Sequence, residues 1–389
     1  MAAVKDMANY PPAKAVTRGP RHHFFGYYDK SPWDRAMRRM LALETTFMDR
    51  PPTGEDVAVV GVVDLGSGTF EPVAETRAWN WQQGTMLRWL PGSDDREIIF
   101  NDLQEGQFVS VILDLETGRQ RVLPRPIYAV APDGRSAVTL NFARLHVHRP
   151  GYGYAGLPDP LVDVPIPPDD GIWRLDLKTG ESQLIVSLEE IAAQQTDERM
   201  AGGLHRFNHL QFNADGTRFI FLHRWKKPEE WGYTRLYTGG PAGEPLCLLA
   251  DEGMTSHFDW RGATHVLAWA RREGKDHFWL FKDRSDRAEV IGEKTLLQDG
   301  HCSYSPDLQW ILNDTYPDRE HRRTLMLYQP ATDRRIDLGK FYSAPEVGEE
   351  IRCDLHPRWS PDGRQVCFDS IHEGTRQMYV VDVGAIVEG

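Results

Sequence analysis

Cysteine is scarce in this sequence, and long apolar runs are missing. The four cysteines among 389 residues, Cys247, Cys302, Cys353 and Cys367, do not show the paired spacing of a disulfide framework. No stretch approaches the roughly 18 apolar residues that mark a membrane helix, and the N-terminal segment lacks the apolar core of a signal peptide. We therefore expect a cytoplasmic protein that does not span a membrane.

Basic residues are also in deficit. Lys and Arg number 45 against 57 Asp and Glu, which gives a formal net charge of −12. This balance argues against a nucleic-acid partner, whose binding needs a basic surface. It also weighs, mildly, against a polyanionic substrate unless basic residues are concentrated locally. A Gly-x-Ser-x-Gly elbow, a P-loop, and a Gly-x-Gly-x-x-Gly between a strand and a helix are all missing, so the sequence gives no support to the enzyme classes built on them.

Aromatic, glycine and proline residues are plentiful by contrast. The chain contains 12 Trp, 13 Tyr and 16 Phe together with 34 Gly and 26 Pro. This composition is typical of many short strands joined by tight turns. A chain of this length exceeds the usual size of a domain with one core, but repeat architectures escape that limit because each repeat adds its own core.

One pattern recurs seven times: an apolar or aromatic strand, a turn of the type Ser/Asn-Pro/Ala-Asp-Gly, and a second strand rich in β-branched and aromatic residues. In this turn Pro presets φ, Asp bonds its own backbone and Gly accepts a positive φ. The copies occupy residues 27–43, 86–102, 128–142, 209–223, 257–271, 301–314 and 356–370.

Two further short strands follow most copies, so each repeat predicts a four-stranded antiparallel sheet. Seven such sheets describe an all-β, seven-bladed β-propeller, a single domain over residues 1–389. The last repeat ends after its third strand, near Val383, while residues 11–20 are left over before the first repeat. We therefore predict that the N-terminal segment supplies the outermost strand of blade seven and closes the ring, which protects exposed strand edges.

Two insertions interrupt the repeats. Residues 145–170 form a segment that is too long and too rich in Pro and Gly for a simple hairpin. Residues 187–204 are predicted to contain a short helix, because Ser187 and Glu190 form a capping box at its start. Long ordered loops on a rigid scaffold often carry substrate contacts, but surface elaboration is an equal alternative.

Histidine occupies one equivalent position in four consecutive repeats. The first strand of each blade lines the propeller axis, so equivalent residues on it surround the axis at one height. Four histidines in register favour a shared divalent ion or shared proton chemistry, while a hydrogen-bonded network with water is the alternative. We call this the ring position; it is held, in chain order, by Tyr27, Met86, Ile127, His209, His257, His301 and His356.

A metal site is the first chemical hypothesis. Imidazole ligands suit Mn, Zn or Fe, and the sequence does not choose among them. Asp354 lies two residues before His356 and so shares its strand face, where it serves either as a ligand or as an acceptor that orients an imidazole. Cys302 should face the opposite side and pack in the core. The candidate metal ligands are His209, His257, His301, His356 and Asp354.

Candidate substrate contacts lie close by in sequence. Arginine is the natural bidentate partner of a carboxylate, and tyrosine can stack on a sugar ring. Tyr27 itself is either a packing residue that helps to close the ring or a sugar-stacking or acid–base group. The candidate binding residues are Arg144, Arg149, Tyr152, His205 and Arg206.

The HHFFGYYDKSPW start (22–33), the inner-strand histidines and the His-Pro-Arg-Trp-Ser-Pro-Asp-Gly ending (356–363) together resemble the β-propeller polysaccharide lyases, above all the oligogalacturonate lyases. Propeller ulvan lyases are a second comparison, and TolB-like propellers of many functions share the blade pattern. The resemblance implies β-elimination at a uronic acid, in which a metal ion or Arg neutralises the carboxylate and a His or Tyr moves the proton.

The resemblance also suggests roles for particular residues. By position, His257 resembles the catalytic histidine of the family, and His301 and His356 resemble metal ligands; His209 and Tyr27 are further acid–base candidates. The family carries a Gln-x-x-His-x-His cluster in the last blade, where this chain has Ile351, Asp354 and His356. The metal site is therefore altered, with His209 or Asp354 as replacement ligands.

The predicted function is a metal-assisted lyase that acts on short acidic oligosaccharides, as a monomer or weak oligomer. One alternative is a different metal-dependent propeller enzyme, for example a hydrolase, or an oxygenase with Fe(II) held by four histidines. Another is a non-catalytic propeller that binds a glycan or a protein, which the loss of the last-blade Gln and His favours.

Overall fold

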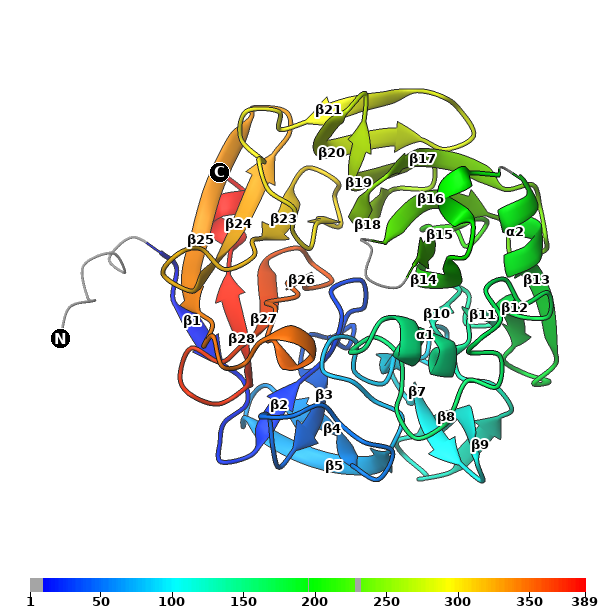
Figure 1. Cartoon of the computed structure of the whole chain (residues 1–389). Coiled ribbons are helices and arrows are strands. Elements are labelled where there is room, and N and C mark those ends of the chain that lie inside the picture. Colours follow the sequence, from blue (N-terminus) through cyan, green and yellow to red (C-terminus); the bar gives the residue numbers. More distant parts are fainter. Residues whose placement is uncertain (1–9, 195, 228–231) are drawn as a thin grey trace.

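The computed structural model describes residues 10–194, 196–227 and 232–389. These residues form seven four-stranded antiparallel sheets arranged around a central axis, so the predicted seven-bladed β-propeller is confirmed (Figure 1). Consecutive strands of the chain pair within each sheet, which suits the short spacing of the repeats.

In blades 1 to 6 the strands run outward from the axis in sequence order, and in blade 7 the outermost strand comes from the N-terminal end of the described chain. Blade 1 contains β2 (His22–Phe24), β3 (Arg39–Thr45), β4 (Ala58–Asp64) and β5 (Thr69–Thr76); blade 2 contains β6 (Arg88–Trp89), β7 (Glu97–Gln104), β8 (Gln107–Asp114) and β9 (Gln120–Leu123); blade 3 contains β10 (Ala129–Val130), β11 (Ser136–Thr139), β12 (Gly171–Asp176) and β13 (Ser182–Ser187); blade 4 contains β14 (Leu204–Phe212), β15 (Phe219–Lys226), β16 (Tyr233–Gly239) and β17 (Cys247–Gly253). Blade 5 contains β18 (Thr255–Arg261), β19 (His265–Arg272), β20 (Lys275–Lys282) and β21 (Ala288–Ile291); blade 6 contains β22 (Ser303–Tyr304), β23 (Ile311–Asp314), β24 (Arg322–Gln329) and β25 (Arg334–Tyr342); blade 7 contains β26 (Arg358–Trp359), β27 (Gln365–Ser370), β28 (Gln377–Asp382) and β1 (Ala13–Ala15).

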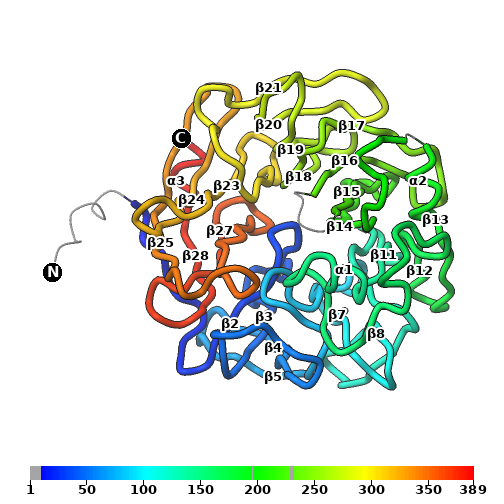
Figure 2. The backbone as a smooth tube through the Cα atoms, viewed as in Figure 1, coloured from blue at the N-terminus to red at the C-terminus, as the bar shows by residue number. Residues whose placement is uncertain are grey.

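The N-terminal strand closes the ring as predicted. Strand β1 pairs antiparallel with β28, with Ala13 opposite Val381, and so completes blade 7 from the opposite end of the chain. The Val16 amide also donates to the Met378 carbonyl at 2.9 Å. In Figure 2 the blue start of the described chain lies against the red C-terminal blade. This closure satisfies an edge that would otherwise expose unpaired backbone groups.

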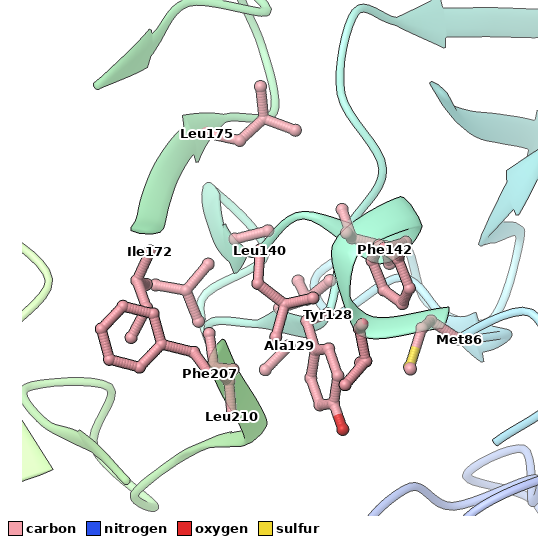
Figure 3. Close-up of a cluster of buried hydrophobic side chains, with 14 of the residues drawn as sticks. Met86, Tyr128, Ala129, Leu140, Phe142, Ile172, Leu175, Phe207 and Leu210 are labelled. Atoms are coloured by element: carbon pink, nitrogen blue, oxygen red, sulfur yellow. The ribbon is translucent and has the colours of Figure 1, made fainter. Parts of the chain in front are cut away.

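Apolar side chains fill the spaces between neighbouring blades. A cluster between blades 2, 3 and 4 includes Met86, Tyr128, Ile172 and Phe207, all buried (Figure 3). Burial of a side chain of this kind contributes roughly 1.5–3 kcal/mol, so each interface between blades is a core of its own. The prediction that Cys302 packs in the core agrees with its full burial.

The two ends of the propeller differ. The turns between the first and second strands of the blades lie at one end, which we call the turn face. Gly134, in such a turn, has a φ of +69°, and an added Cβ would lie 2.0 Å from the Pro91 carbonyl oxygen, so only glycine fits there. The opposite end, the loop face, carries the loops between second and third strands and the connections between blades. The ring position lies toward the loop face, because in blades 2, 3, 6 and 7 it precedes the innermost strand; His209 and His257 lie within β14 and β18, and Tyr27 follows β2.

Both predicted insertions are on the loop face. Residues 145–170 lie between β11 and β12. Helix α1 (Phe142–His148) begins just before this insertion and ends inside it, and the Asn141 side chain caps the helix by accepting from the Arg144 amide. Residues 187–204 join blades 3 and 4 through α2 (Leu188–Gln194) and the 3₁₀ helix η2 (Glu198–Met200). The Glu190 amide donates to Ser187 Oγ at 3.0 Å, as the capping motif predicts. The remaining helical turns are η3 (Glu349–Ile351) and α3 (Gly384–Val387).

None of the helices in the described ranges is long and apolar enough to cross a membrane.

Candidate functional site

Backbone irregularities turn the ring-position side chains toward the axis. Met86, His209 and His356 have φ values of 54°, 52° and 41°, a region that residues other than glycine seldom adopt. The pairing register shifts between Asn208 and Gln211 in β14, and between Thr255 and Phe258 in β18. Such bulges re-aim a side chain and are frequent beside functional sites.

Tyr27 stands at the centre of the four histidines. Its ring centroid lies 4.9 Å from that of His209, 6.5 Å from His257, 5.8 Å from His301 and 4.9 Å from His356. Its hydroxyl is 3.5 Å from His209 Nε2. Burial raises the pKa of Tyr27 well above its usual value, so the phenol holds its proton at neutral pH.

The segment that carries Tyr27 is threaded into the channel. Gly26 has a φ of +135°, and an added Cβ would lie 2.7 Å from the Gln83 carbonyl oxygen, so a side chain there would displace the segment. Arg358 fixes it from blade 7 by donating to the Gly26 and Tyr27 carbonyls, while its guanidinium pairs with Asp369 at 3.1 Å. Tyr28, the next residue, donates to the Phe258 carbonyl at 2.8 Å.

Two of the ring histidines are paired with carboxylates. His257 Nδ1 lies 2.9 Å from Asp299 Oδ1, and His301 Nδ1 lies 2.9 and 3.0 Å from the two oxygens of Asp314. A carboxylate on Nδ1 favours the tautomer with its proton there, which leaves Nε2 as the basic nitrogen. The two imidazole centroids are 4.1 Å apart, so the two His–Asp pairs lie side by side in the same small part of the channel.

A possible metal site lies beside them, formed by His301, Asp354 and His356, whose ligand atoms all lie within 4.8 Å of one another. Both His301 Nε2 and His356 Nε2 are buried without a hydrogen-bond partner. Burial lowers the pKa of His356 well below its usual value, so the ring is neutral and keeps a lone pair. Two unpartnered imidazole nitrogens and a carboxylate fit a divalent transition-metal ion.

Two arginines hold the carboxylate of this group. Arg323 Nη2 and Arg352 Nε each lie 2.7 Å from an oxygen of Asp354. Burial alone would raise the pKa of Asp354, but the charges of Arg323 and Arg352 outweigh it and hold the pKa well below its usual value. Asp354 is therefore ionised, and the two guanidinium groups orient it.

The other two predicted metal ligands do not join this group. His209 Nδ1 lies 3.2 Å from Gln83 Nε2 and 3.3 Å from the Tyr128 hydroxyl, and its Nε2 faces Tyr27. His257 is committed through Nδ1 to Asp299. Two of the four ring histidines, His301 and His356, thus belong with Asp354 to the group that could hold a metal ion, and His209 and His257 lie outside it.

A cluster of arginines lies at the loop-face mouth of the channel. Arg206 in β14 is directly opposite Arg224 in β15, and Arg206 Nε and Nη1 are buried without a partner. Burial, together with the charges of Arg224 and Arg149, lowers the pKa of Arg206 to about 9. Like charges opposite each other on paired strands are destabilising, so this arrangement invites an anion. The basic concentration that a polyanionic ligand requires is present here despite the net charge of −12.

Tyr152 connects these arginines with the ring. Its hydroxyl accepts from Arg352 Nη2 at 2.7 Å, and the Arg149 guanidinium lies 4.9 Å from its ring centroid. The Tyr152 ring packs edge-on against Tyr27 at 6.3 Å and against His209 at 5.5 Å. The structure therefore brings Arg149, Tyr152 and Arg206 of the predicted binding residues to the same mouth.

The remaining two predicted binding residues are bonded within the scaffold. Arg144 is buried and uses all five of its N–H donors: one on the His205 carbonyl, and the others on Asp159 and three carbonyls of the 145–170 insertion. His205 is fully buried, with its Nδ1 2.9 Å from His223 Nε2 and its ring stacked on Trp225. This geometry favours a structural role for both.

Several residues of the site were not recognised in the sequence: Asp299, Asp314, Arg224, Arg323 and Arg352. For Asp299 a signal existed, because Asp299 precedes His301 by two residues just as Asp354 precedes His356. In both cases the carboxylate reaches back to the preceding blade, to His257 and to Arg323 respectively. No comparable spacing marks Arg224 and Arg323, which are 15 and 22 residues from the nearest ring histidine. Arg352 is only four residues before His356, but no arginine holds that place before His301.

Comparisons with known proteins support the fold. No protein-family model matches the chain, and no curated protein sequence does either. Among solved structures, an oligogalacturonate lyase in complex with manganese shares 16% identity at a TM-score of 0.71, over 98% of this chain and 96% of that chain. The oligogalacturonate lyase from Vibrio parahaemolyticus shares 13% at 0.69, over 97% and 95%.

A propeller of a different class also matches. The β-propeller domain of the Trilobed protease from Pyrococcus furiosus shares 10% identity at a TM-score of 0.53, over 89% of this chain and 92% of that chain. The predicted resemblance to the oligogalacturonate lyases is thus confirmed at the level of the fold. Function rests on the site, because propellers of unrelated activities share this architecture.

Proposed function

We propose that this protein is a metal-assisted lyase that cleaves short uronate-containing oligosaccharides by β-elimination. The observation that carries the proposal is the His257–Asp299 pair next to the buried, unpartnered Nε2 atoms of His301 and His356. A base held in the correct tautomer, a site for a cation and a cluster of arginines are the components that this reaction needs. Cytoplasmic location and an imported oligosaccharide as substrate are parts of the same proposal.

The arginines at the mouth bind and orient the uronate. Arg206 and Arg224 offer guanidinium donors that bond no carboxylate in the described chain, and a substrate carboxylate placed between them would relieve their mutual repulsion. Tyr152, held by Arg352, forms the adjoining wall and limits the approach of the sugar ring to the histidines. Positioning of this kind keeps the C5 proton close to a base.

A divalent ion such as manganese would be held by His301, Asp354 and His356, where it supplies positive charge that stabilises the anion formed next to the carboxylate. The protein's own groups transfer the protons. His257 Nε2 accepts the C5 proton, and the electron pair of that C–H bond forms the C4=C5 double bond. The C4–O bond breaks, and its electron pair leaves on the departing glycosidic oxygen.

The departing oxygen requires a proton, and we assign its donation to Tyr27, whose ring lies among the four histidines. Burial raises the pKa of Tyr27, which suits a donor rather than a base at neutral pH. His209, whose Nε2 is 3.5 Å from the Tyr27 hydroxyl, then hydrogen bonds to the phenolate until the proton that His257 took from C5 returns to it through solvent. Asp299 acts through His257 by fixing its tautomer and is a positioning residue.

The test combines metal analysis with the absorbance of the 4,5-unsaturated uronate product. Wild type should contain one equivalent of Mn, Zn or Fe, lose it in the His301→Ala/His356→Ala variant and generate the chromophore on at least one uronate oligosaccharide. A His265→Gln variant, altered at a histidine on β19 outside the ring, serves as the matched control. A folded, metal-free wild type without product on any uronate substrate would contradict the proposal and favour a binding propeller.

A further inference from the structure

A pocket of about 550 Å³ opens directly beside the histidine ring. It lies on the loop face between the 292–302 connection and the sheet of blade 6. Asp299, the carboxylate that orients His257, forms part of its wall, as do Asn313 and Tyr316. The Tyr316 ring centroid is 6.3 Å from that of His257 and 6.5 Å from that of His301. A molecule reacting at His257 therefore has room to extend into this pocket.

The charge of the pocket is opposite to that of the arginine mouth. Among its lining residues, Asp299 and Asp318 are acidic, and Arg335 is the single cation. Arg335 donates through Nε to Asp337 at 2.7 Å, so its charge is already compensated. A carboxylate in this pocket would meet two acidic groups without a free cation, which is unfavourable in a partly enclosed space.

The pocket presents hydrogen-bond acceptors instead. Asn313 is 1% exposed, and its Oδ1 is buried without a hydrogen-bond partner. A carboxylate cannot satisfy such an oxygen, because it has no proton to donate, whereas a sugar hydroxyl can. Thr315, Gln298 and the Tyr316 hydroxyl add further polar groups, and the Tyr316 side chain is 43% exposed as a surface for a sugar ring.

We infer that this pocket binds a neutral sugar joined to the uronate, so that the substrate is a mixed oligosaccharide rather than a polyuronate. The inference rests on the proposed lyase function and specifies its substrate class. The carboxylate of the uronate lies among the arginines, while the hydroxyls of the neighbouring neutral sugar donate to Asn313 and the other acceptors. The arginine cluster and the pocket thus recognise two different sugars.

The experiment compares two disaccharides that differ in one group: a uronic acid that carries a second uronic acid on its O4, and the same uronic acid that carries the corresponding neutral hexose on its O4. We expect kcat/KM, measured from the unsaturated product, to be about tenfold or more higher for the mixed disaccharide. Asp318→Asn keeps a side-chain oxygen that accepts hydrogen bonds in its turn but removes the negative charge. It should therefore reduce the ratio of kcat/KM for the mixed disaccharide to kcat/KM for the diuronide. Tyr316→Ala, at an exposed position, should raise KM for the mixed disaccharide more than for the diuronide.

Equal or better turnover of the diuronide would overturn the inference while leaving the lyase function intact. If neither disaccharide is cleaved, calorimetric titration of both separates the two proposals. Tighter binding of the mixed disaccharide, with the preference reduced in Asn313→Ala and Tyr316→Ala, would support the pocket although the lyase function had failed. Equal binding of both disaccharides would reject the pocket as well.

Discussion

The ring position is used in two ways within one molecule. In blades 2 and 3 it carries Met86 and Ile127, both fully buried and part of the apolar cluster between the blades. In blades 4 to 7 the same backbone position carries histidine, and each histidine keeps a nitrogen near the channel axis. The repeat therefore fixes where a side chain points, and the residue type decides whether that place serves packing or chemistry.

The partners of these residues differ in the same way. Ile127 is braced through its backbone, since its amide and carbonyl both bond the Asn101 side chain at 2.7 Å. His257 and His301 are braced through their side chains by Asp299 and Asp314. A packed residue needs a fixed backbone, whereas the proposed reaction needs a fixed tautomer of histidine, and the two kinds of bracing suit these two needs.

Replacement of His257 should have the largest effect. His257→Asn removes the proposed base and should lower kcat by roughly 10³-fold, within the usual range for general-base removal, with little change in the unfolding free energy. Product formation on a uronate oligosaccharide and urea denaturation measure the two quantities. His265→Gln, in the same blade, is the control and should retain activity. Comparable activity of both variants would show that the ring histidine of blade 5 has no part in the reaction.

Replacement of Ile127 should show the reverse pattern. Ile127→Ala leaves a cavity between blades 2 and 3 and should reduce the unfolding free energy by about 2–5 kcal/mol. Because Ile127 bonds the substrate in no step that we propose, kcat of the folded protein should change by less than about threefold. A large loss of kcat at a temperature where the variant is fully folded would mean that the apolar half of the ring also participates in the reaction.

His205, a histidine away from the ring, tests whether an effect belongs to the ring position or to histidine as a residue type. Burial lowers the pKa of His205 to about 4, so the folded protein leaves this ring neutral while the unfolded chain protonates it near pH 6.5. The stabilisation is complete above pH 6.5 and declines as the pH falls toward 4, by about 3 kcal/mol in total. Urea denaturation across this range should show a shallower pH dependence for His205→Asn, and an unchanged dependence would remove His205 as the cause.

Much of the fold could be predicted from the sequence because the repeats are local. The Asp-Gly turns of residues 209–223 and 356–370, the Pro-Asp-Leu turn of residues 301–314 and the strand patterns around them specify hairpins that need no distant partner. The pairing of β1 with β28 followed from counting strands rather than from any motif. The last repeat contains only three strands, and one strand-length segment remains before the first repeat. Seven complete four-stranded sheets therefore require the first segment to join the last repeat.

The site was predictable only in part, for a physical reason. The histidines repeat with the blades, so alignment of the repeats finds them. The groups that act on them come from other blades and from insertions: Arg352 reaches Tyr152 across 200 positions of sequence, and Arg224 owes its place to strand pairing with Arg206. Arg144 looked equally suitable in sequence, and its five bonds within the scaffold appear only once the insertion is folded.

Two of the buried arginines, Arg144 and Arg206, differ in the same way as the packed and the reactive ring positions. Arg144 has every donor satisfied, whereas Arg206 has two unpartnered nitrogens beside the like charge of Arg224. Arg144→Met should therefore destabilise the protein by roughly 3–5 kcal/mol, the usual cost of breaking a buried ion pair. Arg206→Met should instead stabilise it by about 1 kcal/mol, because it removes a buried charge that lacks a carboxylate partner.

The same Arg206→Met change should weaken binding of a uronate oligosaccharide about tenfold, measured by titration calorimetry with a His257→Asn background to prevent turnover. Opposite signs for stability and affinity would identify Arg206 as a residue kept for its ligand and not for the fold. If Arg206→Met destabilises the protein as Arg144→Met does, and binding is unchanged, then Arg206 belongs to the scaffold. The anion site would in that case have to be assigned to Arg149, Arg224 and Arg352 alone.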